Sequence, residues 1–205
     1  MKTCFFKMAL ALGFSLAISS ATLADQAALS TAVKKVPSLI GHWPLEGDYK
    51  DASGNGNDGG AMGDPGAFGW AEGVNGGKAV TIDSAQFVGS FVDIPAPIGA
   101  ALDTPNVTAI IWVKLSPRSG DHWQAISERD NFWYIETEAK PAEWKGNAVV
   151  YRIYDPNAPG DGGSGQVRDN VNVSIENEVW YQLAWTYDGA VLKGFVNGIG
   201  FEKNV

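Results

Sequence analysis

The feature that most constrains this chain is a succession of short, β-rich runs separated by glycine, proline, asparagine and aspartate. The 205 residues include 25 glycines and 10 prolines, and no stretch after residue 38 repeats apolar residues at helical spacing over three turns. Interrupted runs of this kind are typical of all-β sandwiches and barrels. The predicted strands cover residues 40–44, 79–82, 87–94, 108–115, 124–128, 132–137, 148–154, 171–175, 180–187 and 191–197.

Two of these runs show which residues face the core. In WYQLAWTY, alternation places Tyr181, Leu183, Trp185 and Tyr187 on one face, which we predict to be buried. The run VTAIIWVKL is apolar on both faces, as expected of a central strand between two layers. The dipeptides Asp-Gly at 188–189 and Asn-Gly at 197–198 predict tight hairpin turns.

The N-terminal segment has the pattern of an export signal. Lys2 and Lys7 precede an apolar run, and small residues lead to Asp25, so we predict a signal peptide over residues 1–24. The run is shorter than the roughly 20 residues of a membrane span, and a retained anchor is the alternative. We therefore expect a secreted or periplasmic chain with no membrane insertion after cleavage. After the signal peptide we predict a flexible leader over 25–38 and one domain over 39–205.

The charge balance limits the partners. All 23 acidic residues but only 13 of the 15 basic residues follow residue 24, so residues 25–205 carry a net charge of 13 − 23 = −10. Nucleic acid and anionic membranes require a basic surface and are not expected as partners. The acidity is compatible with divalent cations and neutral glycans, and also with simple solubility. The only cysteine, Cys4, lies in the predicted signal, so no disulfide is expected.

The segment DASGNGNDGG, residues 51–60, has two interpretations. It is not an EF-hand, because the twelfth position should be a bidentate glutamate and is Met62. A looser calcium site would use oxygens of Glu46, Asp51, Asn55, Asn57 and Asp58. Alternatively, Asp51 and Asn55 only cap turns by bonding their own backbone.

Five motifs in order carry a resemblance to a known family. They are GHWPLEGDYKDASGNGNDGG, GGKAVTID, FVDIPAP, VTAIIWVKLSP and WYQLAWTYDGAVLKGFVNG, and they span about residues 40–200. Together they resemble the laminin G-like jelly rolls of the concanavalin A-like lectin and glucanase superfamily. The resemblance implies a two-sheet antiparallel jelly-roll sandwich, and a structural calcium near the glycine-rich loop in many such domains. Domains of this family usually continue into closing strands, so with the chain ending at Val205 we predict a sandwich that lacks its last strands.

A ligand site is predicted in the segment DHWQAISERDNFWY, residues 121–134. Sugars stack their apolar faces on aromatic rings while polar side chains bond their hydroxyls. The candidate residues are Trp123, Arg129, Asp130, Asn131 and Trp133. A core position for Trp133 is the alternative. Trp70 and Trp144 also lie beside predicted loops.

No catalytic constellation is evident. Glycosidases need two carboxyl groups across the scissile bond. Glu136 and Glu138 share one face of a predicted strand, but the E-x-D-x-x-E pattern of glycan-cleaving relatives is incomplete, which favours a solvated strand end. His42 and His122 have no zinc-site spacing.

These observations predict a secreted, non-catalytic binding module whose partner is a carbohydrate or another extracellular surface, such as that of a protein. Calcium is its candidate cofactor. An adhesion or structural fragment of a larger extracellular protein is the alternative, and a glycan-cleaving enzyme is a third.

Overall fold

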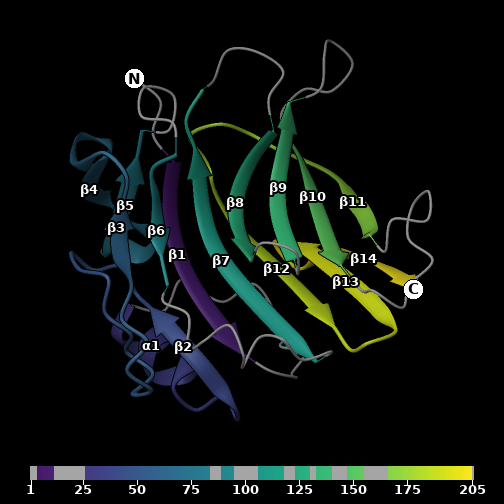
Figure 1. The fold of residues 1–205 in the computed structure, drawn as a ribbon, viewed down its shortest axis with the longest axis horizontal. Coiled ribbons are helices and arrows are strands. Elements are labelled where there is room, and N and C mark those ends of the chain that lie inside the picture. The colour runs from purple at the N-terminus through teal and green to yellow at the C-terminus, as the bar shows by residue number, and fades with distance from the viewer. Residues whose placement is uncertain are drawn as a thin grey trace.

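The computed structural model describes residues 4–11, 26–83, 89–94, 106–117, 123–129, 133–139, 147–154 and 166–204. Strands dominate these ranges (Figure 1). The first strands are β1 (Cys4–Ala11), β2 (Leu39–Trp43), β3 (Gly60–Met62), β4 (Phe68–Glu72), β5 (Lys78–Ile82), β6 (Phe91–Asp93) and β7 (Val107–Leu115). They are followed by β8 (Trp123–Arg129), β9 (Trp133–Ala139), β10 (Asn147–Tyr154), β11 (Gln166–Ile175), β12 (Trp180–Tyr187), β13 (Val191–Val196) and β14 (Ile199–Asn204). The helices are α1 (Gln26–Val33) and the 3-10 turns η1 (Pro65–Ala67) and η2 (Val74–Gly76).

The strands form two main antiparallel sheets and a small ribbon. The larger sheet has the order β14-β13-β12-β7-β1-β5-β4, with β2 also paired to β1, and the smaller has the order β11-β10-β9-β8. Strands β3 and β6 pair separately. In Figure 1 the smaller sheet lies in front of the β12–β14 side of the larger one. The chain is therefore an all-β antiparallel sandwich, as the sequence predicted.

The core fills the space between the two sheets. The larger sheet contributes Ile111, Val113 and Trp185, and the smaller contributes Ile135 and Val149. The hydroxyl of Tyr151, on β10, donates a hydrogen bond to the backbone oxygen of Phe195, on β13, and so connects the two sheets. Apolar burial between two layers is the main source of stability for such a fold.

The predicted alternation of the β12 strand is confirmed. Leu183, Trp185 and Tyr187 are buried, and Tyr181 packs half-buried against the same core. Both predicted hairpin turns are also present. The Asp188 carboxylate accepts from the backbone N–H groups of Ala190 and Val191, at 3.0 and 2.7 Å, at the β12–β13 turn. Asn197 and Gly198 have φ angles of 49° and 79°, which suit the tight β13–β14 turn.

Four strands were not predicted, namely β1, β3, β4 and β14. Strand β1 lies within the predicted signal peptide, and the larger sheet is continuous because β1 occupies its middle. The predicted leader contains helix α1, so residues 26–33 are helical. The described residues contain no helix that is long and apolar enough to cross a membrane.

Candidate functional site

The glycine-rich loop after β2 is organised around the carboxylate of Asp51. Its Oδ1 atom accepts from the backbone N–H groups of His42 and Ser53, at 2.9 and 2.8 Å. Its Oδ2 atom accepts from the Ser53 hydroxyl at 2.7 Å and from the Asn57 N–H at 3.0 Å. A carboxylate offers about four acceptor positions, so these donors use the whole group.

The two asparagines of the loop attach it to β2. The Asn55 side-chain amide donates to the backbone oxygens of Leu39 and Ile40, at 2.7 and 3.0 Å. The Asn57 amide also donates to the Ile40 oxygen, at 2.9 Å. Gly54 and Gly56 have φ angles of 96° and 77°, a region in which a side chain would strain the backbone. The loop is thus folded back on its own strand.

These bonds also set the protonation of Asp51. Burial of the carboxyl opposes ionisation, but the hydrogen bonds from His42, Ser53 and Asn57 outweigh it and hold the pKa of Asp51 below its ordinary value. A carboxylate that accepts several N–H donors is stabilised in its charged form.

Of the predicted calcium ligands, Asp51 has no carboxylate oxygen left for a calcium ion. Calcium needs six to eight oxygen atoms with free lone pairs, whereas Asp51 is fully used by N–H and O–H donors. Glu46 points elsewhere, because its Oε2 atom accepts from the Lys78 N–H at 2.7 Å. Asp58 accepts from the Asp51 N–H at 2.9 Å. Within the described ranges, no three His, Cys, Asp or Glu side chains are grouped as a metal site. The geometry favours the turn interpretation.

The same loop positions an aromatic residue at the edge of the sandwich. The N–H of Gly59 donates to the backbone oxygen of Tyr49 at 2.8 Å, which closes the loop formed by residues 49–59. The Tyr49 ring lies against the ring of Trp70, with centroids 5.4 Å apart and planes tilted by 43°. We call Tyr49 and Trp70 the edge aromatic pair.

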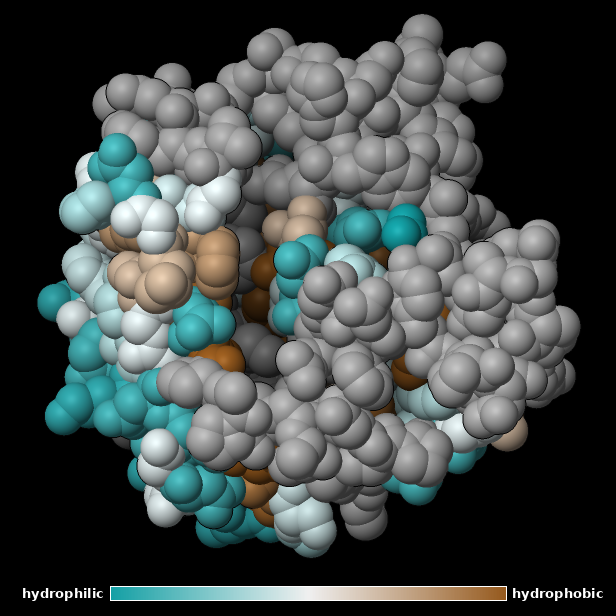
Figure 2. All heavy atoms as spheres, in the orientation of Figure 1, coloured by the Kyte–Doolittle hydropathy of each residue, from teal (hydrophilic) through white to brown (hydrophobic). Residues whose placement is uncertain are grey.

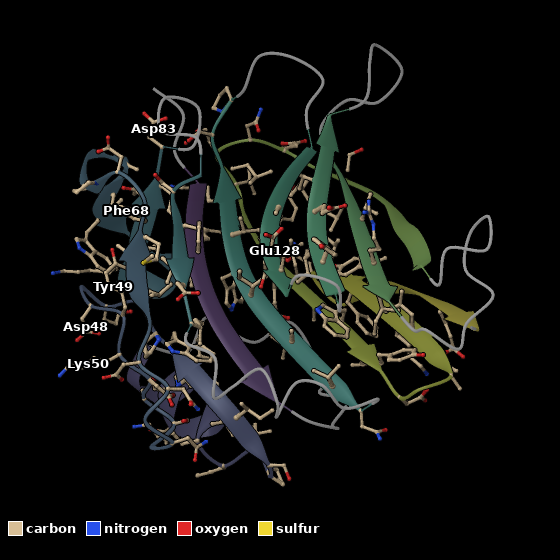
Figure 3. The ribbon with its side chains drawn as sticks, viewed as in Figure 1. Asp48, Tyr49, Lys50, Phe68, Asp83 and Glu128 are labelled. Carbon is tan, nitrogen blue, oxygen red and sulfur yellow. The ribbon has the colours of Figure 1, made fainter. Side chains whose placement is uncertain are left out.

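The edge aromatic pair is accessible to solvent and has charged neighbours. Trp70 lies on β4, one of the two edge strands of the larger sheet, with 39% of its surface exposed. Asp48 and Lys50 flank Tyr49 in the chain and are exposed, and Figure 3 shows both at the outer side of the molecule. Glu72, also exposed, lies two residues after Trp70 and therefore on the same face of β4. Burial raises the pKa of Tyr49 above its ordinary value.

A second exposed apolar surface lies on the β3–β6 ribbon. Met62 and Phe91 are opposite each other in the register, and each is 51% exposed. Figure 2 shows a hydrophobic patch over this part of the molecule and a hollow beside it, lined partly by hydrophobic residues. Apolar side chains exposed side by side mark an interaction surface more often than scattered ones do.

The structure brings two residues of the predicted ligand site, Arg129 and Trp133, opposite each other and places Trp123 at a distance from them. Trp123 pairs with Glu138 at one end of the β8–β9 hairpin, and Arg129 pairs with Trp133 at the other end. Arg129 comes six positions after Trp123 along β8, which corresponds to about 20 Å of strand. Asp130 and Asn131 lie outside the described residues.

The prediction of a solvated strand end at Glu136 is wrong. Glu136 is buried on β9, and its Oε2 atom lies 3.0 Å from Nη2 of Arg152 on β10. The Arg152 guanidinium also lies 5.5 Å from the centre of the Tyr134 ring. Neighbouring strands supply all three residues, of which Glu136 is buried and Tyr134 and Arg152 are half-buried, and we call them the buried ion-pair cluster. Strand spacing could not reveal it, because the partner Arg152 is 16 residues away.

Glu128 lies on the same side of the hairpin as Tyr134, which is its register partner. Figure 3 shows Glu128 near the middle of the view, well away from Asp48, Tyr49 and Lys50. The edge aromatic pair and the buried ion-pair cluster are therefore separate regions.

Comparison with known proteins identifies a structural class but no family. No protein-family model and no curated protein sequence matches the chain. Among solved structures, the chain is similar to domain 4 of AbnA, a GH43 extracellular arabinanase from Geobacillus stearothermophilus, in complex with arabinotriose. The TM-score is 0.51 at 19% identity, over 77% of this chain and 70% of that one. The chain thus has the β-sandwich fold found in that domain.

Proposed function

We propose that this protein is an exported, non-catalytic β-sandwich module of laminin G-like type that binds carbohydrate at the edge aromatic pair. The observation that carries the proposal is the exposed Trp70 ring lying against Tyr49 at 5.4 Å, on the open edge of the larger sheet. Sugar recognition combines an aromatic platform with polar groups around it.

The neighbouring groups match the chemistry of a neutral sugar. The apolar face of a pyranose or furanose ring would stack on Trp70, and its hydroxyls would bond to the exposed Asp48, Lys50 and Glu72. The net charge of −10 for residues 25–205 disfavours polyanionic glycans. The structural neighbour was solved with arabinotriose, which supports a neutral saccharide as the first probe.

The absence of catalysis is also part of the proposal. Glu136 is committed to Arg152 through a 3.0 Å ion pair in a buried setting, whereas a glycosidase acid must hold a proton near neutral pH. A guanidinium at this distance favours the ionised carboxylate.

The test is titration of the full chain with arabinotriose and a panel of neutral oligosaccharides by calorimetry. We expect Trp70→Ala to weaken binding about 5- to 30-fold, because stacking on one indole contributes roughly 1 to 2 kcal/mol. The control is Ile199→Ala, which truncates a 63% exposed apolar residue away from β4. Unchanged affinity in Trp70→Ala would contradict the site, and no binding of any neutral saccharide would contradict the function.

A further inference from the structure

Strand β1 occupies an interior position of the larger sheet. On one side it pairs with β7 along its whole length, from Cys4 opposite Leu115 to Ala11 opposite Thr108. On the other side it pairs with β5 through Cys4 to Phe6, and with β2 through Met8 to Ala11. Among the described strands, only β1 connects β7 to β5 and β2, and Figure 1 shows it between β5 and β7.

The same residues form the start of the predicted signal peptide. Cleavage before Asp25 would remove β1 together with the rest of residues 1–24. The edge of β7 that faces β1 would then lose its partner, although β7 is a central strand whose alternate side chains, Ala109, Ile111 and Val113 among them, are buried on one face. An unpaired backbone in the interior of a sheet carries unsatisfied hydrogen-bonding groups at a high free-energy cost. Loss of β1 would leave a gap with β7 on one side and β5 and β2 on the other. We call this gap the acceptor seam.

The register defines what the acceptor seam can hold. Phe6, Met8 and Leu10 are opposite Val113, Ile111 and Ala109, which are at most 2% exposed. The alternate positions, such as Lys7 opposite the half-buried Trp112, face the other side of the sheet and tolerate polar residues. A fitting segment is therefore extended and about eight residues long, with a large apolar residue at every second position.

We propose that processing of the exported chain turns the acceptor seam into a binding site for a β-strand donated by a partner polypeptide. The donated strand lies antiparallel to β7, and its apolar residues take the places of Phe6, Met8 and Leu10. Main-chain hydrogen bonds provide affinity in this mode of binding, and the pockets for alternate side chains provide specificity. The inference rests on the proposed export, but it does not depend on carbohydrate binding.

The experiment uses the full chain with a specific protease site in place of residues 19–24, which is cut after folding. We expect the severed N-terminal segment to stay bound, and a labelled synthetic peptide of residues 3–12 to exchange into its place. A control peptide with Phe6→Asp and Met8→Asp should bind at least about 100-fold more weakly, because it buries charge against an apolar face. A second control peptide carries N-methyl groups on the alternate backbone nitrogens that would face β7. It cannot donate hydrogen bonds to β7 and should also fail to exchange.

Several results would overturn the proposal. One is a severed chain that stays monomeric and folded after the N-terminal peptide is removed. In that case the amide protons of β7 would be as protected from hydrogen exchange as they were before the cut. Dimerisation of the severed chain would assign the seam to a second copy, and unfolding that the peptide does not reverse would exclude an acceptor site. Mass spectrometry of the exported chain must show a start at Asp25, since retention of residues 1–24 would leave β1 in place. Saccharide titration at Trp70 is a separate readout, so the two proposals can fail independently.

Discussion

The edge aromatic pair and the buried ion-pair cluster contain similar side chains in opposite surroundings. Each combines aromatic rings with charged groups, but Trp70 is 39% exposed whereas Glu136 is 8% exposed. In the cluster, Glu136 and Arg152 bond to each other and Tyr134 lies beside the guanidinium. At the edge, Asp48 and Lys50 extend outward from the molecule (Figure 3). Composition alone therefore does not distinguish the proposed binding surface from a structural contact, whereas the exposed fraction of the side chains does.

The largest expected effect is on the cluster. Arg152→Ala leaves the Glu136 carboxylate without its guanidinium, and we expect the free energy of unfolding to fall by about 3 kcal/mol or more. Urea denaturation measures the change. The double variant Glu136→Leu/Arg152→Met should recover most of the loss, because an apolar pair of similar size avoids the desolvation of two charges. Saccharide affinity of the folded variants should match the parent, and a loss of affinity would move the binding site to the smaller sheet.

The second prediction tests whether the glycine-rich loop is a turn or a metal site. Asp51→Ala leaves the N–H groups of His42, Ser53 and Asn57 without their acceptor, and we expect the free energy of unfolding to fall by about 2 kcal/mol. For each of the two proteins, the thermal midpoint measured with calcium should equal the midpoint measured with a chelator. The control Asp48→Ala loses only a local bond to the Lys50 N–H and should change stability by less than about 0.5 kcal/mol. A calcium-dependent rise in the parent's midpoint, lost in Asp51→Ala, would restore the metal interpretation.

The smallest effect is the pH dependence of the same carboxylate. The pKa of Asp51 is below its ordinary 3.8 in the folded chain, so the unfolded chain binds the proton more readily. The stabilisation is complete above the unfolded value and is lost as pH falls through the folded one. We expect urea midpoints measured from about pH 5 to about pH 2.5 to fall more steeply in the parent than in Asp51→Asn. Asp188, whose pKa is also lowered, is present in both proteins and cancels. Parallel curves would show that the Asp51 bonds do not stabilise its charge.

The comparison also shows how far local sequence patterns extend. Alternation in β12 and the two hairpin turns were predicted correctly, because each depends on neighbouring residues. Strand β4 was not predicted, because its five residues, FGWAE, include a glycine and follow a proline-containing turn. Trp70 was consequently assigned to a loop, and its contact with Tyr49, 21 residues earlier, has no signal in the sequence.

By itself the sequence determined the fold class, the buried face of β12 and the turns that separate the strands. These follow from residue spacing and from the φ angles that glycine and asparagine allow. Only the tertiary structure decided that Asp51 uses its oxygens on backbone N–H groups, that Arg152 neutralises Glu136, and that β1 lies between β7 and β5. The physical reason is the same in each case. Partners distant in the chain are brought together by strand pairing, and hydrogen bonding and burial depend on those partners.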